Sequence, residues 1–368
     1  MSRTKGMGPL LTAAQTGETA RWLASRQESA GEFPWIPGGK LDPWNHVHAA
    51  MGLVTAGYLD EARRAYRYLT AHQQADGGWA RWSVKGQTTD NGHETNQAAY
   101  LASGLWHLYL ADEDSDFLAE MWPVVDRAVD FVVELRMPDG SISWARDPEG
   151  IPEDYPLLTG NSSTFGSLVA ALRIAEHLGH DRPAWRTTAI DLGDIIRNNI
   201  ERFTDHRMPD PPGRFSMDWY YPVLAGPIRG AAGRRRLLDL AQTGTFLSEG
   251  EGCRCVSESP WYTIAETSEL AIALDTVGLV DRAEEVFSWI HRYRLDDGAY
   301  HMGVVMPDEV PFPPGELSPW NVAAVLITDD VLRGESATSD FFRSLGGEDV
   351  LDDSALSTGT NDSLAASA

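Results

Sequence analysis

The sequence predicts an all-α protein folded as an (α/α)6 toroid, a ring of six helical hairpins. A glycine turn recurs along the chain at Gly31, Gly77, Gly140 and Gly298, and each glycine is followed two positions later by a bulky apolar residue. Between the turns, amphipathic helices alternate with helices that are apolar nearly all round, as expected when the first kind covers the second. An open curved solenoid remains the structural alternative, because repetition shows stacking and not closure.

The spacing of the turns leaves room for six copies. The intervals between the four glycines are 46, 63 and 158 residues. The last interval is long enough to contain two degenerate copies, which we place near Gly213 and Gly252.

The elements follow in strict alternation. Helices whose apolar residues return at three and four positions, with charge opposite, are predicted as outer helices at residues 13–27, 59–74, 117–136, 183–203, 231–244 and 280–294. Helices rich in Ala, Gly and Leu and poor in charge are predicted as inner helices at residues 44–57, 94–110, 162–179, 218–230, 261–278 and 320–332. We expect one toroid domain over residues 12–334, after a flexible N-terminus at 1–11. The small and polar residues of 335–368 predict a disordered acidic tail.

The composition excludes some classes of function. The 54 acidic and 30 basic residues give a net charge of −24, which disfavours nucleic-acid binding. No apolar run approaches the roughly 20 residues of a membrane span. The first residues contain no secretory signal, and two cysteines are too few for a disulfide framework, so we predict a cytoplasmic protein. The sequence does not determine the oligomeric state.

One turn carries a family resemblance. Gln74, Gly77 and Trp79 match the Gln, Gly, any residue, Trp motif of the squalene-cyclase and prenyltransferase repeat superfamily, which the chain resembles over about residues 12–334. The resemblance implies the toroid and an isoprenoid-type substrate in its central cavity. The Asp-x-Asp-Asp-Thr segment of the family's proton-initiated cyclases corresponds to residues 91–95, where only Thr95 is identical. His93 stands where that family has its protonating aspartate.

Polar and aromatic residues gather where the turns enter the inner helices. If the ring closes, they face one mouth, which is the usual setting of a small-molecule site. The candidate catalytic residues are Asp218, His93, Glu94 and Glu266. The candidate substrate-binding residues are Trp44, His46, Asn96, Trp219, Tyr220, Tyr221, Trp261, Trp320 and Asn321. Asp, Asn and Ser at such positions also cap helices, and we favour that role for Asp42, Asn161 and Ser162.

Three functions remain open. The first is a terpene-cyclase-like or prenyltransferase-like enzyme with acid and base residues at the mouth. The second is a carbohydrate-active enzyme, because six-hairpin hydrolases, lyases and epimerases share this ring and could pair Asp218 with Glu94 or Glu266. The third is a noncatalytic helical binding scaffold. Glu251 and Cys253 form an acid-x-Cys pair, but no histidine on the predicted inner helix at residues 320–332 completes a zinc site, so we predict no metal and no cofactor.

Overall fold

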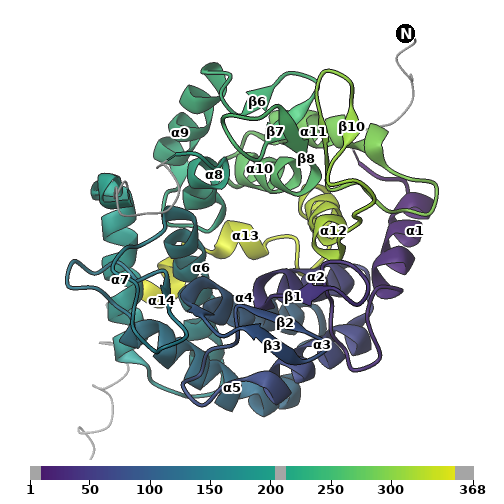
Figure 1. Ribbon diagram of the computed structural model, residues 1–368. Helices are drawn as coiled ribbons and strands as arrows, with labels where there is room; N and C mark the ends of the chain where they lie inside the picture. The colour runs from purple at the N-terminus through teal and green to yellow at the C-terminus, as the bar shows by residue number, and fades with distance from the viewer. Residues whose placement is uncertain (1–9, 204–212, 353–368) are drawn as a thin grey trace, which may run out of the picture.

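The structure, a computed structural model, describes residues 10–203 and 213–352. Its helices form a ring of alternating outer and inner helices (Figure 1). The outer helices of the described part are α1 (Ala13–Ala24), α3 (Leu59–His72), α5 (Ser115–Glu134), α7 (Pro183–Asn198), α9 (Gly230–Gln242) and α11 (Val280–Ser288). The inner helices there are α2 (Pro43–Thr55), α4 (Thr95–Asp112), α6 (Leu158–His177), α8 (Met217–Leu224), α10 (Ile264–Thr276) and α12 (Pro319–Arg333).

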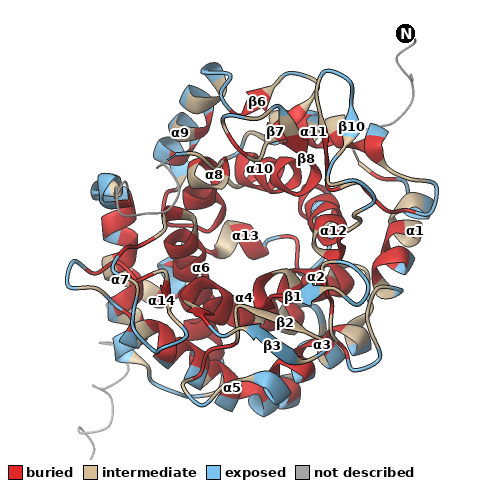
Figure 2. Ribbon diagram, in the orientation of Figure 1, coloured by how far each residue is buried: buried red, intermediate tan, exposed pale blue. Residues whose placement is uncertain are grey.

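The ring is closed. Each inner helix packs against the next, and the last, α12, packs against the first, α2. The predicted (α/α)6 toroid is therefore confirmed, and an open solenoid is excluded. Figure 2 shows the inner helices almost wholly buried, whereas the outer helices expose one face to solvent.

The recurrent glycine turn joins neighbouring hairpins. Gly77 has a positive φ of 95°, and a Cβ atom there would lie 2.1 Å from the carbonyl oxygen of Arg127 on α5. Two residues later the Trp79 indole is buried and donates a hydrogen bond of 2.8 Å to the Leu69 carbonyl. Gly298 has a similar φ and lies against Glu18 of α1, so the same turn also links the last outer helix to the first.

Short strands connect the outer helices to the inner ones. β1 (Lys40–Leu41), β2 (Trp82–Val84) and β3 (Gln87–Asp90) form one antiparallel sheet, and β4 (His93–Glu94) pairs with β5 (Ala145–Arg146). The largest sheet has the order β10-β9-β8-β7-β6, and its strands are β6 (Leu247–Ser248), β7 (Gly252–Arg254), β8 (Trp261–Thr263), β9 (Gly303–Val305) and β10 (Val310–Pro311).

This sheet corrects one predicted helix boundary. The helix predicted over residues 261–278 begins instead at Ile264, because residues 261–263 pair with 303–305 of β9. Two predicted outer helices also end as 3-10 turns, η1 (Ile200–Phe203) and η2 (Trp289–Tyr293).

The segment after α12 also differs from the prediction. Residues 335–352, predicted as the start of a disordered tail, contain α13 (Phe341–Ser344) and α14 (Glu348–Leu351), while 353–368 lie outside the described residues. The side chains of Phe341 and Phe342 are buried under the ring. The apolar end of the ring that these two side chains cover exists only once the ring has closed. Composition alone therefore could not show where residues 335–352 lie.

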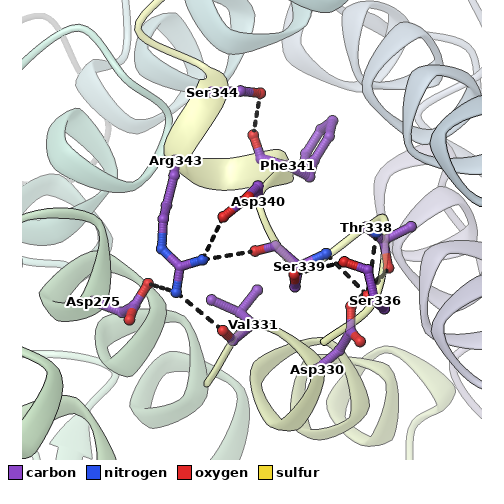
Figure 3. A network of polar contacts seen from close by, with 10 residues as sticks. All are labelled: Asp275, Asp330, Val331, Ser336, Thr338, Ser339, Asp340, Phe341, Arg343 and Ser344. Carbon is purple, nitrogen blue, oxygen red and sulfur yellow. Dashed lines mark hydrogen bonds and ion pairs between the residues drawn. The ribbon is translucent and has the colours of Figure 1, made fainter. Parts of the chain in front are cut away.

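Polar contacts fix this C-terminal segment to the inner helices. Arg343 forms an ion pair of 2.7 Å with Asp275 of α10 and donates to the Val331 carbonyl of α12 at 3.1 Å (Figure 3). Arg173 of α6 binds both carboxylate oxygens of Asp349, at 2.9 and 2.7 Å. These partners lie toward the C-terminal ends of their helices, so the segment covers the end of the ring opposite the inner-helix starts.

Within residues 10–203 and 213–352, no helix is both long enough and apolar enough to cross a bilayer.

Candidate active site

The inner helices begin at one end of the ring, which we call the mouth. Asp42 is the N-cap of α2, Glu94 is the N-cap of α4, and Glu266 lies in the first turn of α10. The order of contacts around the ring places α4 and α10 on opposite sides, as Figure 1 also shows. Glu94 and Glu266 therefore lie across the mouth from each other.

Glu94 is a partly buried acid with a perturbed proton affinity. Its side chain is 14% exposed, and its Oε1 lies 2.9 Å from the Nε of Arg81. Burial raises the pKa of Glu94 from 4.5 to about 7, with a further rise from the nearby Asp42 charge and opposing contributions from Arg81 and the Trp144 indole. At neutral pH this carboxyl is therefore present in both its protonated and its ionised form.

Arg81 is held in one position beside Glu94. Its guanidinium carbon lies 4.8 Å from the centroid of the Trp144 ring, and its NH1 pairs with Asp90 at 3.2 Å. Gly92 leaves space for it, because a Cβ atom there would come within 2.7 Å of Arg81 NH2. The planar cation stacks on the indole and also forms ion pairs with two carboxylates.

Asp42 lies on the same side of the mouth and acts as a cap. Its Oδ1 accepts the Asn45 backbone amide at 2.9 Å, as the sequence predicted for a helix start. Its Oδ2 accepts the Trp35 indole at 2.6 Å and the Asn45 side-chain amide at 2.7 Å. Burial raises the pKa of Asp42, while these bonds favour its charged form.

Two carboxylates lie on the opposite side of the ring. Glu266 is 4% exposed, and its carboxyl contacts the thiol of Cys255. One turn deeper, Glu269 accepts hydrogen bonds from the hydroxyls of Tyr220 at 2.6 Å and Tyr221 at 3.1 Å. Burial raises the pKa of Glu269 to about 8, so this deeper carboxyl is mostly protonated at neutral pH.

Aromatic rings form a layer inside the ring of inner helices. Trp44 stacks on Tyr100 with ring centroids 4.8 Å apart and an angle of 18°, and it meets Tyr221 at 5.7 Å. A cavity of only 10 Å³ lies beside this layer, and Phe341 and Phe342 close it from the far end. A space of this size holds at most about one water molecule, so the ring is not an open channel.

Two predicted site residues lie away from the mouth. The His93 ring meets Phe131 of the outer helix α5, and its Nδ1 lies 2.9 Å from Asp76, which also pairs with Arg146. His93 thus packs β4 against the outer helix α5 and does not point toward the mouth. Trp219 of α8 donates its indole proton to the Arg236 carbonyl of α9 and is buried between α8 and α9.

His46 is likewise a packing residue. Its Nδ1 accepts the Phe33 amide at 3.1 Å, and its Nε2 donates to the Ala65 carbonyl at 2.9 Å. Burial lowers the pKa of His46 to about 4, which keeps the ring neutral. Both nitrogens are occupied, so neither is free to bind a substrate.

Asp218 joins two inner helices. Its Oδ1 accepts the backbone amide and the hydroxyl of Thr159 on α6, at 3.2 and 2.8 Å. Burial raises the pKa of Asp218, and the Thr159 bonds oppose that rise. The contacts favour a bracing role over proton transfer.

The remaining predicted residues stay at or near the mouth. Trp320 and Asn321 lie in the first turn of α12, and the Asn321 amide donates to the His301 carbonyl at 2.7 Å. Asn96 lies in the first turn of α4 and is 8% exposed, whereas Trp261 begins β8. Arg81 and Trp144 were not predicted, because they reach Glu94 from the connections that follow α3 and α5, and no local pattern marks such a contact.

The acid-x-Cys pair considered for zinc does not form a site. Cys253 is fully buried, and Glu251 pairs with Arg292. In the part of the chain that the structure describes, no group of three or more His, Cys, Asp or Glu residues is arranged to hold a metal ion.

Comparison with known proteins identifies one curated relative over nearly the whole chain. The sequence is 39% identical over 340 residues to the MMP endo-(1,4)-3-O-methyl-alpha-D-mannosidase of Mycolicibacterium hassiacum, covering 92% of each protein. No family model matches the chain.

Solved structures share the fold at low sequence identity. A glycosidase in complex with glucose has a TM-score of 0.68 at 14% identity, over 88% of this chain and 99% of the glycosidase. A D-mannose isomerase has a TM-score of 0.62 at 11% identity, over 86% of this chain and 96% of the isomerase. The cellobiose 2-epimerase of Spirochaeta thermophila has a TM-score of 0.59 at 15% identity, over 86% and 94%.

These findings overturn the predicted family and its reaction. The assignment to the squalene-cyclase and prenyltransferase superfamily is wrong, and so is the isoprenoid-type enzyme, because the relative is a mannosidase and the structural neighbours act on sugars. The turn motif misled because it encodes how one hairpin packs on the next, a requirement that rings of unrelated activity share. The carbohydrate-active alternative is the one that the comparisons support.

Proposed function

The chain belongs to the family of the MMP endo-(1,4)-3-O-methyl-alpha-D-mannosidase, and on that premise we propose that it is a glycoside hydrolase that cleaves internal bonds of a 3-O-methylated α-(1,4)-mannose chain. The observation that supports a hydrolase most directly is the placement of Glu94, a carboxyl whose burial raises its pKa to about 7, across the mouth from Glu266.

The two carboxyls have different roles in the proposed reaction. Glycoside hydrolysis requires one carboxylic acid to protonate the leaving oxygen and one carboxylate on the other side of the sugar. Glu94 donates its proton to the glycosidic oxygen as the bond to the anomeric carbon breaks. Glu266 accepts a proton from the water molecule that attacks that carbon, and the water supplies the hydroxyl of the new reducing end. Glu266 then releases this proton to solvent, and Glu94 takes up a proton from solvent for the next cycle.

The closed far end of the ring favours internal cleavage. Phe341 and Phe342 close the end of the ring opposite the mouth, so a polysaccharide cannot pass through the ring. A chain must instead lie across the mouth, where either side of the scissile bond can extend outward. We propose that Trp44 contacts the sugar between the two carboxyls, together with Asn96 and Trp320, because all three lie in the first turns of inner helices.

The proposal is tested by removing each acid in turn. We expect Glu94→Gln and Glu266→Gln each to lower the rate on a 3-O-methylated α-(1,4)-oligomannoside by about 10² to 10⁴-fold, as for the loss of a general acid or base. Product lengths are measured by mass spectrometry. The matched control is Glu120→Gln, which removes an exposed carboxylate of α5 paired with Arg67. Full activity in both mouth variants, with unchanged circular dichroism, would refute these roles.

A further inference from the structure

A row of apolar side chains crosses the sheet beside the mouth. In the register of the sheet, Trp261 of β8 lies opposite Val305 of β9, and Val305 lies opposite Val310 of β10. Directly paired residues lie on one face of a sheet, and Phe312, two positions after Val310, points to that same face. We call these four residues, Trp261, Val305, Val310 and Phe312, the apolar shelf.

The shelf is open to solvent, although the opposite face of the same sheet packs against the core. Tyr262 and Val304, which alternate with the shelf residues, are buried. On the shelf itself, Val310 is 54% exposed and Phe312 is 46% exposed, and Figure 2 shows β10 at the surface. Apolar side chains gathered on one exposed face mark a binding surface more often than scattered ones do.

The shelf has a fixed shape. The Trp261 indole donates a hydrogen bond of 3.1 Å to the Phe312 carbonyl, and the two rings meet edge to face with centroids 5.6 Å apart. Gly303 makes room for the indole, because a Cβ atom there would come within 2.7 Å of its nitrogen. The one polar atom of the shelf is thus already satisfied within the protein, which leaves an apolar surface to a ligand.

The shelf lies close to the proposed active site along the chain. Strand β8 runs directly into α10, so Trp261 stands only five positions before Glu266 in the sequence. Two other exposed apolar residues, Ile36 and Ile151, also lie in loops that precede inner helices. A sugar chain that crosses the mouth toward α10 would therefore meet the shelf next.

We propose that the apolar shelf binds the methyl ethers of O-methylated mannose units beside the scissile bond and so selects methylated chains over unmethylated ones. This inference rests on the proposed function. A methyl ether brings an apolar surface to Val310 and Phe312, whereas a free hydroxyl in the same place loses its water without gaining a partner. The shelf thus sets specificity and takes no part in the proton transfers.

The test compares two ligands that differ only in methylation. The probes are a 3-O-methylated α-(1,4)-oligomannoside and its unmethylated counterpart of equal length, and their binding to the Glu94→Gln protein is measured by calorimetry. We expect tighter binding of the methylated probe by about tenfold, the lower end of the range for one small apolar group in a protein site. Adding Val310→Thr, which keeps the side-chain shape, or Phe312→Ser should remove most of that preference and leave the unmethylated probe's affinity unchanged.

A matched control separates the shelf from exposed valines in general. Val280 begins the outer helix α11 and is 44% exposed, so Val280→Thr should keep the preference. The proposal is overturned if both probes bind equally, if neither binds, or if the shelf variants weaken both probes alike. Cleavage of both probes by the unmodified protein without preference would contradict the shelf alone, and preferential binding without any cleavage would contradict the proposed function alone.

Discussion

The ion pair between Arg81 and Glu94 decides the behaviour of the proposed acid. Burial and the Asp42 charge raise the pKa of Glu94, and the Arg81 cation at 2.9 Å lowers it, which leaves it at about 7. Without the cation the carboxyl would stay protonated to higher pH, and without burial it would be ionised well below neutrality. Two further titratable groups lie near the pair: Asp90, which is bound to Arg81, and the Tyr155 hydroxyl, which stays neutral because burial raises its pKa to about 12.

Replacing Arg81 should therefore move the pH profile of the reaction. The acid acts in its protonated form, so kcat/KM of the unmodified enzyme should fall as pH rises through about 7. In Arg81→Met the pKa of Glu94 rises further, and this basic limb should shift upward by about one pH unit or more. The measurement is kcat/KM against pH on the oligomannoside.

Two controls distinguish this effect from a general loss of structure. Arg81→Lys keeps a cation and should restore part of the original profile, and Arg67→Met, which removes an exposed ion pair on the outer helix α3, should leave it unchanged. A lower rate at every pH with no movement of the basic limb would mean that Arg81 only holds the loop.

At the scale of elements, the turn from an outer to an inner helix is the unit that builds the ring. The glycine of this turn combines a left-handed backbone with contact against the next outer helix, as Gly77 does against Arg127 of α5. The turn ends one helix, starts the next and leaves the following residues at the mouth. Its position in the hairpin therefore explains why polar residues collect at that end.

Substituting Gly77 should cost more than backbone strain alone. Gly57 also has a positive φ, of 79°, but no atom lies within 4 Å of a Cβ atom placed there. We expect Gly57→Ala to lower the free energy of unfolding by about 1 kcal/mol, from backbone strain. Gly77→Ala should lower it by roughly 2 kcal/mol or more beyond that, because two packed elements must separate. Urea unfolding of both variants measures the difference. Equal losses of unfolding free energy would show that α5 moves away from residue 77 at little cost.

At the scale of the whole molecule, the C-terminal segment closes one end of the ring. It binds α6 through Arg173 and α10 through Asp275, and it inserts Phe341 and Phe342 beneath the aromatic layer. With that end filled, the mouth is the accessible end, where the proposed chemistry lies.

Removing the segment should destabilise the ring. Truncation after Gly334 leaves the apolar opening uncovered and should lower the melting temperature, because each buried phenylalanine contributes about 2 kcal/mol or more. The control is truncation after Asp352, which removes the part of the predicted acidic tail that lies outside the described residues and is expected to change the melting temperature little. Equal melting temperatures for the two truncations would show that the segment contributes nothing to stability.

Much of the candidate site's location could be predicted from the sequence, but the surroundings that set the proton affinity of Glu94 could not. Glu94 and Glu266 were predicted from their positions at the starts of two inner helices. His93 stands next to Glu94 in the chain, yet it points to Phe131 behind the strand, since neighbouring residues of a strand face opposite ways. His46 and Trp219 likewise satisfy buried contacts that no spacing in the sequence records.

The sequence by itself determined the alternation of outer and inner helices, the glycine turns and the end of each hairpin at which polar residues gather. These features depend on periodicity and turn chemistry over a few residues. Only the tertiary structure decided that α12 meets α2, that residues 335–352 close the far end, and that Arg81, Asp42 and Trp144 converge on Glu94. Each of these depends on contacts between residues far apart in the chain, and the proton affinity of a buried acid is set by all the charges and dipoles around it, whichever hairpin supplies them.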